Sequence, residues 1–87
     1  MSQLVNTGKS HAASDRPDSE EFLRLGILCS TGRSAPLDMI SAHKYFNIAA
    51  MLGSKEAIRL RHEVAEEMSA REIAAAQRAA RDWFTRH

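Results

Sequence analysis

The chain has few of the residues that support sheets, disulfides or membrane spans. A single cysteine, Cys29, excludes an internal disulfide. No apolar run has the length needed to cross a bilayer, and no segment shows the alternating β-branched pattern of a strand. The formal net charge is only +1, so the chain lacks the basic field typical of nucleic-acid binders. These absences favour a small helical domain with no membrane contact.

The length of 87 residues allows one small domain with a thin core. Residues 1–17 are rich in Ser, Gly, Asn, Lys and His, so we expect a flexible tail there and a helical domain over 18–87. The N-terminal residues also lack the apolar core of a secretory signal. We therefore expect a cytoplasmic protein.

Capping residues predict where four helices begin. Asp18, Asp38, Ser54 and Ser69 are N-cap types, and Ser69 is followed by Glu72 in a capping box. Glycines 32 and 53 are suited to end the first two helices. The expected helices run over 19–31, 39–52, 55–68 and 70–86.

Each predicted helix has apolar or small residues at helical spacing, which indicates one buried face per helix. In the helix over 19–31 the expected face is Phe22, Leu25, Gly26 and Cys29, and in that over 39–52 it is Met39, Ala42, Tyr45 or Phe46, Ala49 and Ala50. In the helix over 55–68 it is Ala57, Leu60, Val64 and Met68, and in that over 70–86 it is Ile73, Ala76, Ala80, Trp83 and Phe84. Short connections make consecutive helices antiparallel. The predicted fold is all-α, with two stacked antiparallel helical hairpins that form a short α/α solenoid.

The small residues and glycines of the first two helices form a recognisable signature. Its members are Leu25, Gly26, Gly32, Asp38, Ala42, Tyr45, Phe46, Ala49, Ala50, Gly53 and Ala57. This pattern resembles the Sel-one-like repeat, a relative of the tetratricopeptide repeat. Cys29 replaces an aromatic residue of that pattern, and Ser34 and Ala35 replace a glycine and a valine. The resemblance implies one full repeat over about 22–57 and a degenerate capping repeat over about 55–86.

The same resemblance implies an adaptor or scaffold that binds another protein. No set of nucleophile, base and orienting residue is readable in the sequence, so we expect a non-enzymatic protein without a cofactor. The histidines, at positions 11, 43, 62 and 87, lack metal-ligand spacing, and we expect no metal site. Two alternatives remain: a nucleic-acid-binding regulator that uses arginines of the last two helices, and an accessory subunit of a larger complex.

The first helix offers a candidate contact for a partner or for a second copy. Leu23 and Ile27 lie off the expected buried face, with Leu28 beside them. In a longer repeat array a preceding unit would cover such residues. Because closed two-fold pairs are the commonest homo-oligomers, we expect a homodimer through this strip. We expect Trp83 and Phe84 to pack in the core rather than to act as an anchor for a partner.

Overall fold

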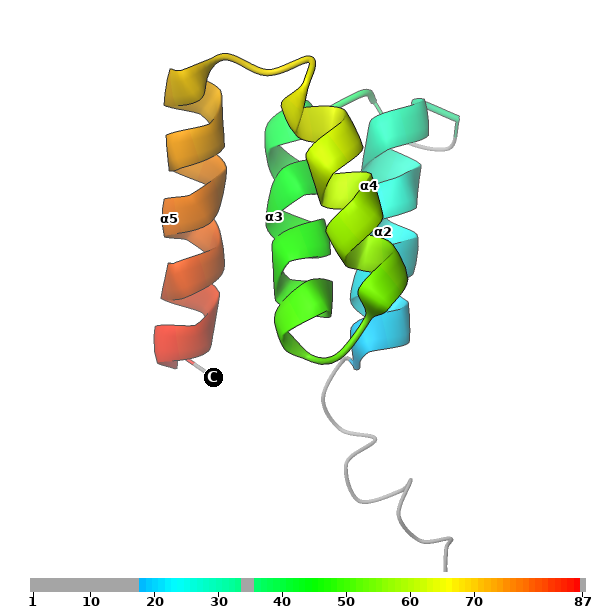
Figure 1. Cartoon of the computed structure of the whole chain (residues 1–87), viewed down its shortest axis with the longest axis vertical. Helices are drawn as coiled ribbons and strands as arrows, with labels where there is room; N and C mark the ends of the chain where they lie inside the picture. Colours follow the sequence, from blue (N-terminus) through cyan, green and yellow to red (C-terminus); the bar gives the residue numbers. More distant parts are fainter. Residues whose placement is uncertain (1–17, 34–35, 87) are drawn as a thin grey trace, which may run out of the picture.

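The computed structural model describes residues 18–33 and 36–86, and this part of the chain is all-α, without a strand. The helices are α2 (Ser19–Thr31), α3 (Met39–Met51), α4 (Lys55–Ala65) and α5 (Ala70–Arg86). Consecutive helices run antiparallel, as two stacked hairpins require (Figure 1). The expected tail over 1–17 lies outside the described residues, as do Ser34 and Ala35.

The predicted caps begin all four helices. In each case a side-chain oxygen accepts a hydrogen bond from the backbone N–H three residues later, which satisfies one of the free donors of the first turn. The pairs are Asp18 with Glu21 at 3.0 Å, Asp38 with Ser41 at 3.0 Å, Ser54 with Ala57 at 3.1 Å, and Ser69 with Glu72 at 3.1 Å. The Ser69 N–H also donates to Glu72 Oε1 over 2.9 Å, which completes the predicted capping box.

The helix ends agree with the glycine positions but not with every predicted boundary. Gly32 lies in the left-handed region at φ 70°, which explains a glycine at that position. α3 ends at Met51, one residue earlier than predicted, and α4 ends at Ala65 rather than at 68. After Ala65, three successive N–H groups bond to carbonyls three residues back, a tighter turn than an α-helix makes.

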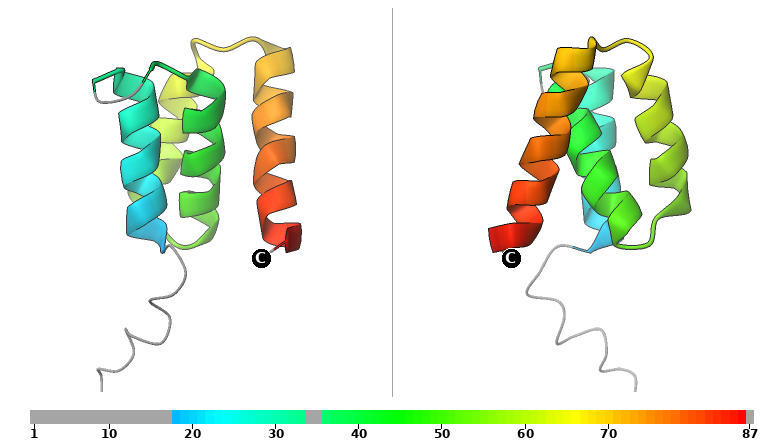
Figure 2. Two further views of the ribbon diagram at one scale, coloured as in Figure 1. Left: turned by 180° about the vertical axis from the view of Figure 1, so that it is seen from behind. Right: turned by 60° about the vertical axis from the view of Figure 1, so that its left-hand side comes forward.

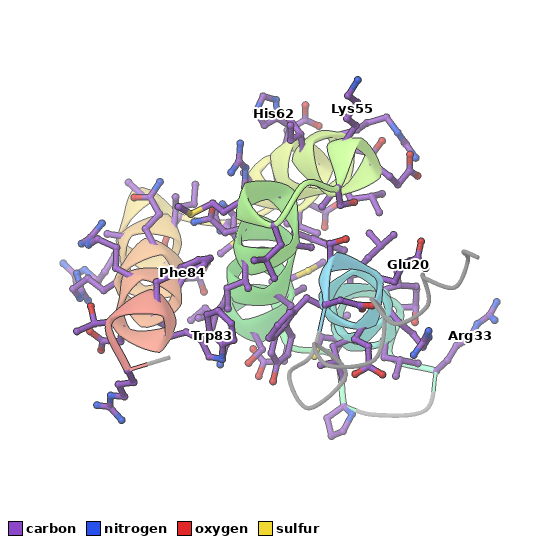
Figure 3. All side chains as sticks on the ribbon, turned by 90° about the horizontal axis from the view of Figure 1, so that it is seen from below. Glu20, Arg33, Lys55, His62, Trp83 and Phe84 are labelled. Carbon is purple, nitrogen blue, oxygen red and sulfur yellow. The ribbon has the colours of Figure 1, made fainter. Side chains whose placement is uncertain are left out.

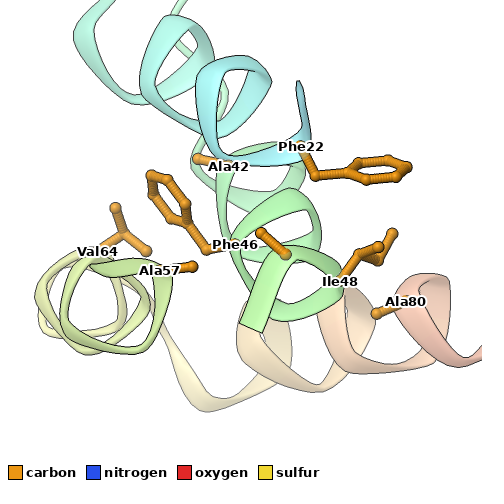
Figure 4. Packing of buried hydrophobic residues seen from close by; sticks show 8 residues of the cluster. Phe22, Ala42, Phe46, Ile48, Ala57, Val64 and Ala80 are labelled. Carbon is orange, nitrogen blue, oxygen red and sulfur yellow. The ribbon is translucent and has the colours of Figure 1, made fainter. Parts of the chain in front are cut away.

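α3 is the central helix and contacts the other three. Figure 4 shows Phe46 on the side of α2 and α4, close to Val64 and Ala57, whereas Ile48 points towards Ala80 of α5. Both of these α3 side chains are fully buried. The buried apolar residues are Phe22, Ala42, Phe46, Ile48, Ala49, Ala57, Val64, Ala76 and Ala80. The core is therefore arranged around α3 rather than inside either hairpin.

The contact between α2 and α3 depends on Gly26. Gly26 is buried, and a Cβ atom added there would lie 2.6 Å from Cδ1 of Phe46. A real Cβ atom does not approach a ring carbon so closely. The bare glycine backbone therefore lets the Phe46 ring lie directly against α2.

The predicted face of α2 is wrong at its edges. Leu25, expected inside, is 38% exposed, while Leu23, expected outside, packs against the core. The reason is the position of α4: Ser30, two turns after Leu23 on the same side of the helix, lines a cavity with Leu60 and Val64 of α4. That side of α2 faces α4, whereas Leu25 lies at the other edge of the buried face.

Aromatic rings join the C-terminal part of α5 to α2. Trp83 makes edge-to-face contacts with Phe22 at 5.0 Å and with Phe84 at 4.9 Å between ring centroids. Trp83 and Phe84 both pack against the core cluster, as predicted. α5 thus packs along α3 and makes few contacts with α4, so the second hairpin is open (Figure 2).

We predict that Gly26→Ala destabilises the protein. Alanine usually stabilises a helix interior by about 1 kcal/mol relative to glycine. Here the new methyl group meets the buried Phe46 ring, and overpacking of this kind costs about 1–3 kcal/mol. We therefore expect a lower free energy of unfolding, measured by urea denaturation.

The double variant Gly26→Ala/Phe46→Leu provides the control, because the smaller side chain leaves room for the methyl group. We expect Gly26→Ala to cost less, or to stabilise, in the Phe46→Leu background. An unchanged cost in that background would show that the ring is not what excludes a side chain at position 26.

Candidate functional site

A cavity of about 350 Å³ lies between α3, α4 and α5. It exists because α4 and α5 stand apart on two sides of α3, as the view from below in Figure 3 shows. The lining residues are His43 and Asn47 of α3, Arg61, His62 and Ala65 of α4, and Ile73 and Gln77 of α5. Five of the seven are polar, and none is acidic.

Helical spacing places each pair of lining residues on one side of its helix. His43 and Asn47 are four residues apart on α3, as are Ile73 and Gln77 on α5. Arg61 lies one turn before Ala65 on α4. Each helix thus contributes one turn of its surface to the cavity.

Arg61 and Asn47 are joined across the cavity by a hydrogen bond. The guanidinium Nη1 donates to Asn47 Oδ1 over 2.7 Å. One lone pair of the amide oxygen is used by this bond, and the Asn47 amide nitrogen and the remaining guanidinium N–H groups are donors that a ligand can use. This pair presents hydrogen-bond donors and one positive charge.

His43 is the buried polar residue of this region, with 3% of its surface exposed. Its Nδ1 is buried and has no hydrogen-bond partner among the described residues. Burial lowers the pKa of the imidazole from its ordinary value of 6.5, and the positive charges of Arg61 and His62 lower it further. His43 is therefore neutral near neutral pH, in an environment that already carries excess positive charge.

Two exposed apolar side chains continue the line of the cavity towards the turn between α3 and α4. Met51, 66% exposed, follows Asn47 by one turn of α3, and Ile58, 42% exposed, precedes Arg61 by one turn of α4. Methionine adapts its shape to varied partners. Helical spacing thus places two exposed apolar side chains on the same sides of α3 and α4 as Asn47 and Arg61.

The predicted partner strip on α2 is only partly exposed. Ile27 is 40% exposed, Leu28 is half-buried, and Leu23 packs against the core. The exposed apolar surface of α2 therefore consists of Ile27 and, on another side, Leu25. Leu23 and Leu28 are both partly buried, so the contact through Leu23, Ile27 and Leu28 stays a prediction.

Most of the repeat-signature residues have structural roles. Ala42, Phe46, Ala49 and Ala57 lie in the core, Asp38 caps α3, and Tyr45 and Ala50 pack against the core. Cys29 also packs against the core, and burial raises the pKa of its thiol, which disfavours the reactive thiolate. These residues build the scaffold and leave the cavity as the candidate site.

Sequence reasoning missed the cavity, although one signal was present. That signal is the pair His43 and Asn47, two polar residues one turn apart on the same side of α3. Residues 18–33 and 36–86 contain no group of three His, Cys, Asp or Glu side chains arranged for a metal ion. None of the described helices is long and apolar enough to span a membrane.

Comparisons with protein-family models, with curated proteins and with solved structures found no match. The resemblance to the Sel-one-like repeat therefore stays a prediction from the signature residues.

We predict that acidification destabilises the protein through His43. The folded state holds this imidazole below its ordinary pKa of 6.5, so the unfolded chain takes up the proton first as the pH falls. The free energy of unfolding should decrease from about pH 7 downwards, by at most about 1.4 kcal/mol per pH unit for one proton, and level off below the folded pKa. Urea denaturation at a series of pH values measures the slope.

The variant His43→Leu should flatten this slope, because leucine does not titrate and suits a buried position. His62→Gln is the matched control, since His62 is exposed, and it should retain most of the slope. A slope that survives His43→Leu unchanged would assign the effect to another group.

Proposed function

We propose that this protein is a non-enzymatic helical module that binds another protein. The observation that carries the proposal is the cavity between α3, α4 and α5, with the exposed Met51 and Ile58 beside it. A few convergent polar groups next to exposed apolar surface are typical of binding sites. The predicted Sel-one-like signature, which implies an adaptor or scaffold, supports the same function.

The chemistry of the cavity favours binding over catalysis. Its lining side chains offer imidazole, guanidinium and amide groups, but no carboxylate, hydroxyl or thiol. Covalent catalysis by acyl or group transfer uses such a nucleophile beside a base. Cys29 lies outside this lining, in contact with the core.

The arginines of α4 support nucleic-acid binding less well than the sequence indicates. Arg59 forms ion pairs with Glu56 and Glu63, so its charge is largely balanced. Arg61 donates to Asn47 and lines the cavity, so a nucleic acid would have to reach its charge inside the cavity. A protein partner therefore remains our proposal, and a nucleic acid is an outcome that the experiment must detect.

The test begins with cross-linking of the full chain in its native cell, followed by reconstitution with the purified partner. We expect a complex of fixed stoichiometry that withstands nuclease treatment. Met51→Glu/Ile58→Glu should weaken the complex by about tenfold or more, because it places charge in a contact that buries apolar surface.

The matched control is Leu37→Glu, which alters an exposed leucine just before the start of α3. It should bind as the wild type does. The proposal would be contradicted if the cross-linked complex were lost after nuclease treatment. It would also be contradicted if both variants weakened the complex equally.

A homodimer through Leu23, Ile27 and Leu28 of α2 is a separate prediction, and Ile27 is the most exposed of the three. In a two-fold contact Ile27 would be buried against its own copy. Sedimentation equilibrium should show a dimer for the wild type and a monomer for Ile27→Glu. Leu37→Glu is again the control. A wild type that stays monomeric at about 1 mM would exclude a dimer of useful affinity.

A further inference from the structure

We infer that the cavity between α3, α4 and α5 binds a carboxylate side chain from an acidic and partly apolar segment of a partner protein. This inference rests on the proposed function and names the chemistry of the partner. It concerns a site that lies between three helices and that contains no repeat-signature residue.

The first argument is charge. Arg61 brings a permanent positive charge to the cavity, His62 lies beside it, and none of the lining residues is acidic. On the other side of α4, by contrast, Arg59 is balanced by Glu56 and Glu63. The cavity thus holds an arginine whose positive charge no carboxylate within the lining neutralises.

The second argument is the direction of the hydrogen bonds. Asn47 Oδ1 already accepts from Arg61, so the amide nitrogen of Asn47 and the free guanidinium N–H groups remain to donate. A ligand that complements this array supplies acceptors, and charge-assisted bonds from guanidinium to carboxylate are stronger than bonds between neutral groups.

The third argument is His43, a buried polar side chain that lines the same cavity. Its Nδ1 has no hydrogen-bond partner among the described residues. Unpaired buried polar groups are costly and therefore rare. A bound anion beside Arg61 and His62 would also offset the positive charge that surrounds this imidazole.

The apolar residues in and beside the cavity favour a protein segment over a nucleic acid as its ligand. Ile73 and Ala65 lie in the cavity wall, and Met51 and Ile58 are exposed one turn further along their helices. A peptide that carries both carboxylates and aliphatic side chains would contact both parts. A phosphate backbone would use the charge but leave the apolar part uncovered.

The probe is a short peptide of alternating glutamate and leucine with blocked ends, and its control is the same peptide with glutamine in place of glutamate. NMR titration of the full chain follows the side-chain amide signals of Asn47 and Gln77. We expect saturable shifts of both signals with the acidic peptide and much weaker binding of the glutamine peptide.

Arg61→Gln should weaken binding of the acidic peptide by about tenfold or more, which corresponds to loss of one charge-assisted bond. Gln77→Ala, at an exposed position, provides a second cavity variant that should weaken binding less. Arg59→Gln removes the same charge from the other side of α4 and should change affinity by less than about twofold. Circular dichroism confirms that each variant is folded.

Four results would overturn the inference. These are the absence of a saturable shift, equal weakening by Arg61→Gln and Arg59→Gln, equal affinity for the glutamine peptide, and tighter binding of inorganic phosphate or a DNA duplex at the same signals. If a purified natural partner binds but Arg61→Gln leaves its affinity unchanged, this inference fails while the proposed function stands. If the acidic peptide binds and no protein partner exists, the proposed function fails instead.

Discussion

The close approach of the Phe46 ring to the backbone of Gly26 sets the geometry of the whole domain. It fixes the separation of α2 and α3, and it places the largest fully buried side chain on the side of α3 that also faces α4. Ala57 and Val64 of α4 pack into the space that remains. In a domain of this size few side chains are buried completely, so one large ring in the correct position accounts for much of the stability.

The opposite side of α3 determines where α5 lies. Ile48 is as fully buried as Phe46 but points the other way, and Ala80 of α5 covers it. The rings of Trp83 and Phe84 then join the end of α5 to Phe22 of α2. Because α5 is held against α3 along its length, it stands away from α4. The cavity at His43 and Arg61 is the direct result of this arrangement.

The sequence was sufficient to predict what depends on local interactions. The caps at Asp18, Asp38, Ser54 and Ser69 and the left-handed Gly32 are formed within a few residues, so four helix starts and the end of α2 were predicted correctly. The exposure of Leu25 and the partial burial of Leu23 depend instead on where α4 lies against α2. The polar pair His43 and Asn47 was readable in the sequence, but the position of the cavity was not. It requires α5 to pack on α3 rather than on α4, its neighbour in sequence, and no local pattern encodes that choice.

The open second hairpin is the central claim of this account, since the candidate site exists only if α5 stays on α3. The most direct measurement is a methyl NOESY spectrum of the full chain in solution. The account predicts strong cross-peaks between the methyl groups of Ile48 and Ala80, and much weaker ones between Ala65 of α4 and Ile73 of α5, which both line the cavity. Strong cross-peaks between Ala65 and Ile73 without any between Ile48 and Ala80 would show a closed hairpin and remove the site.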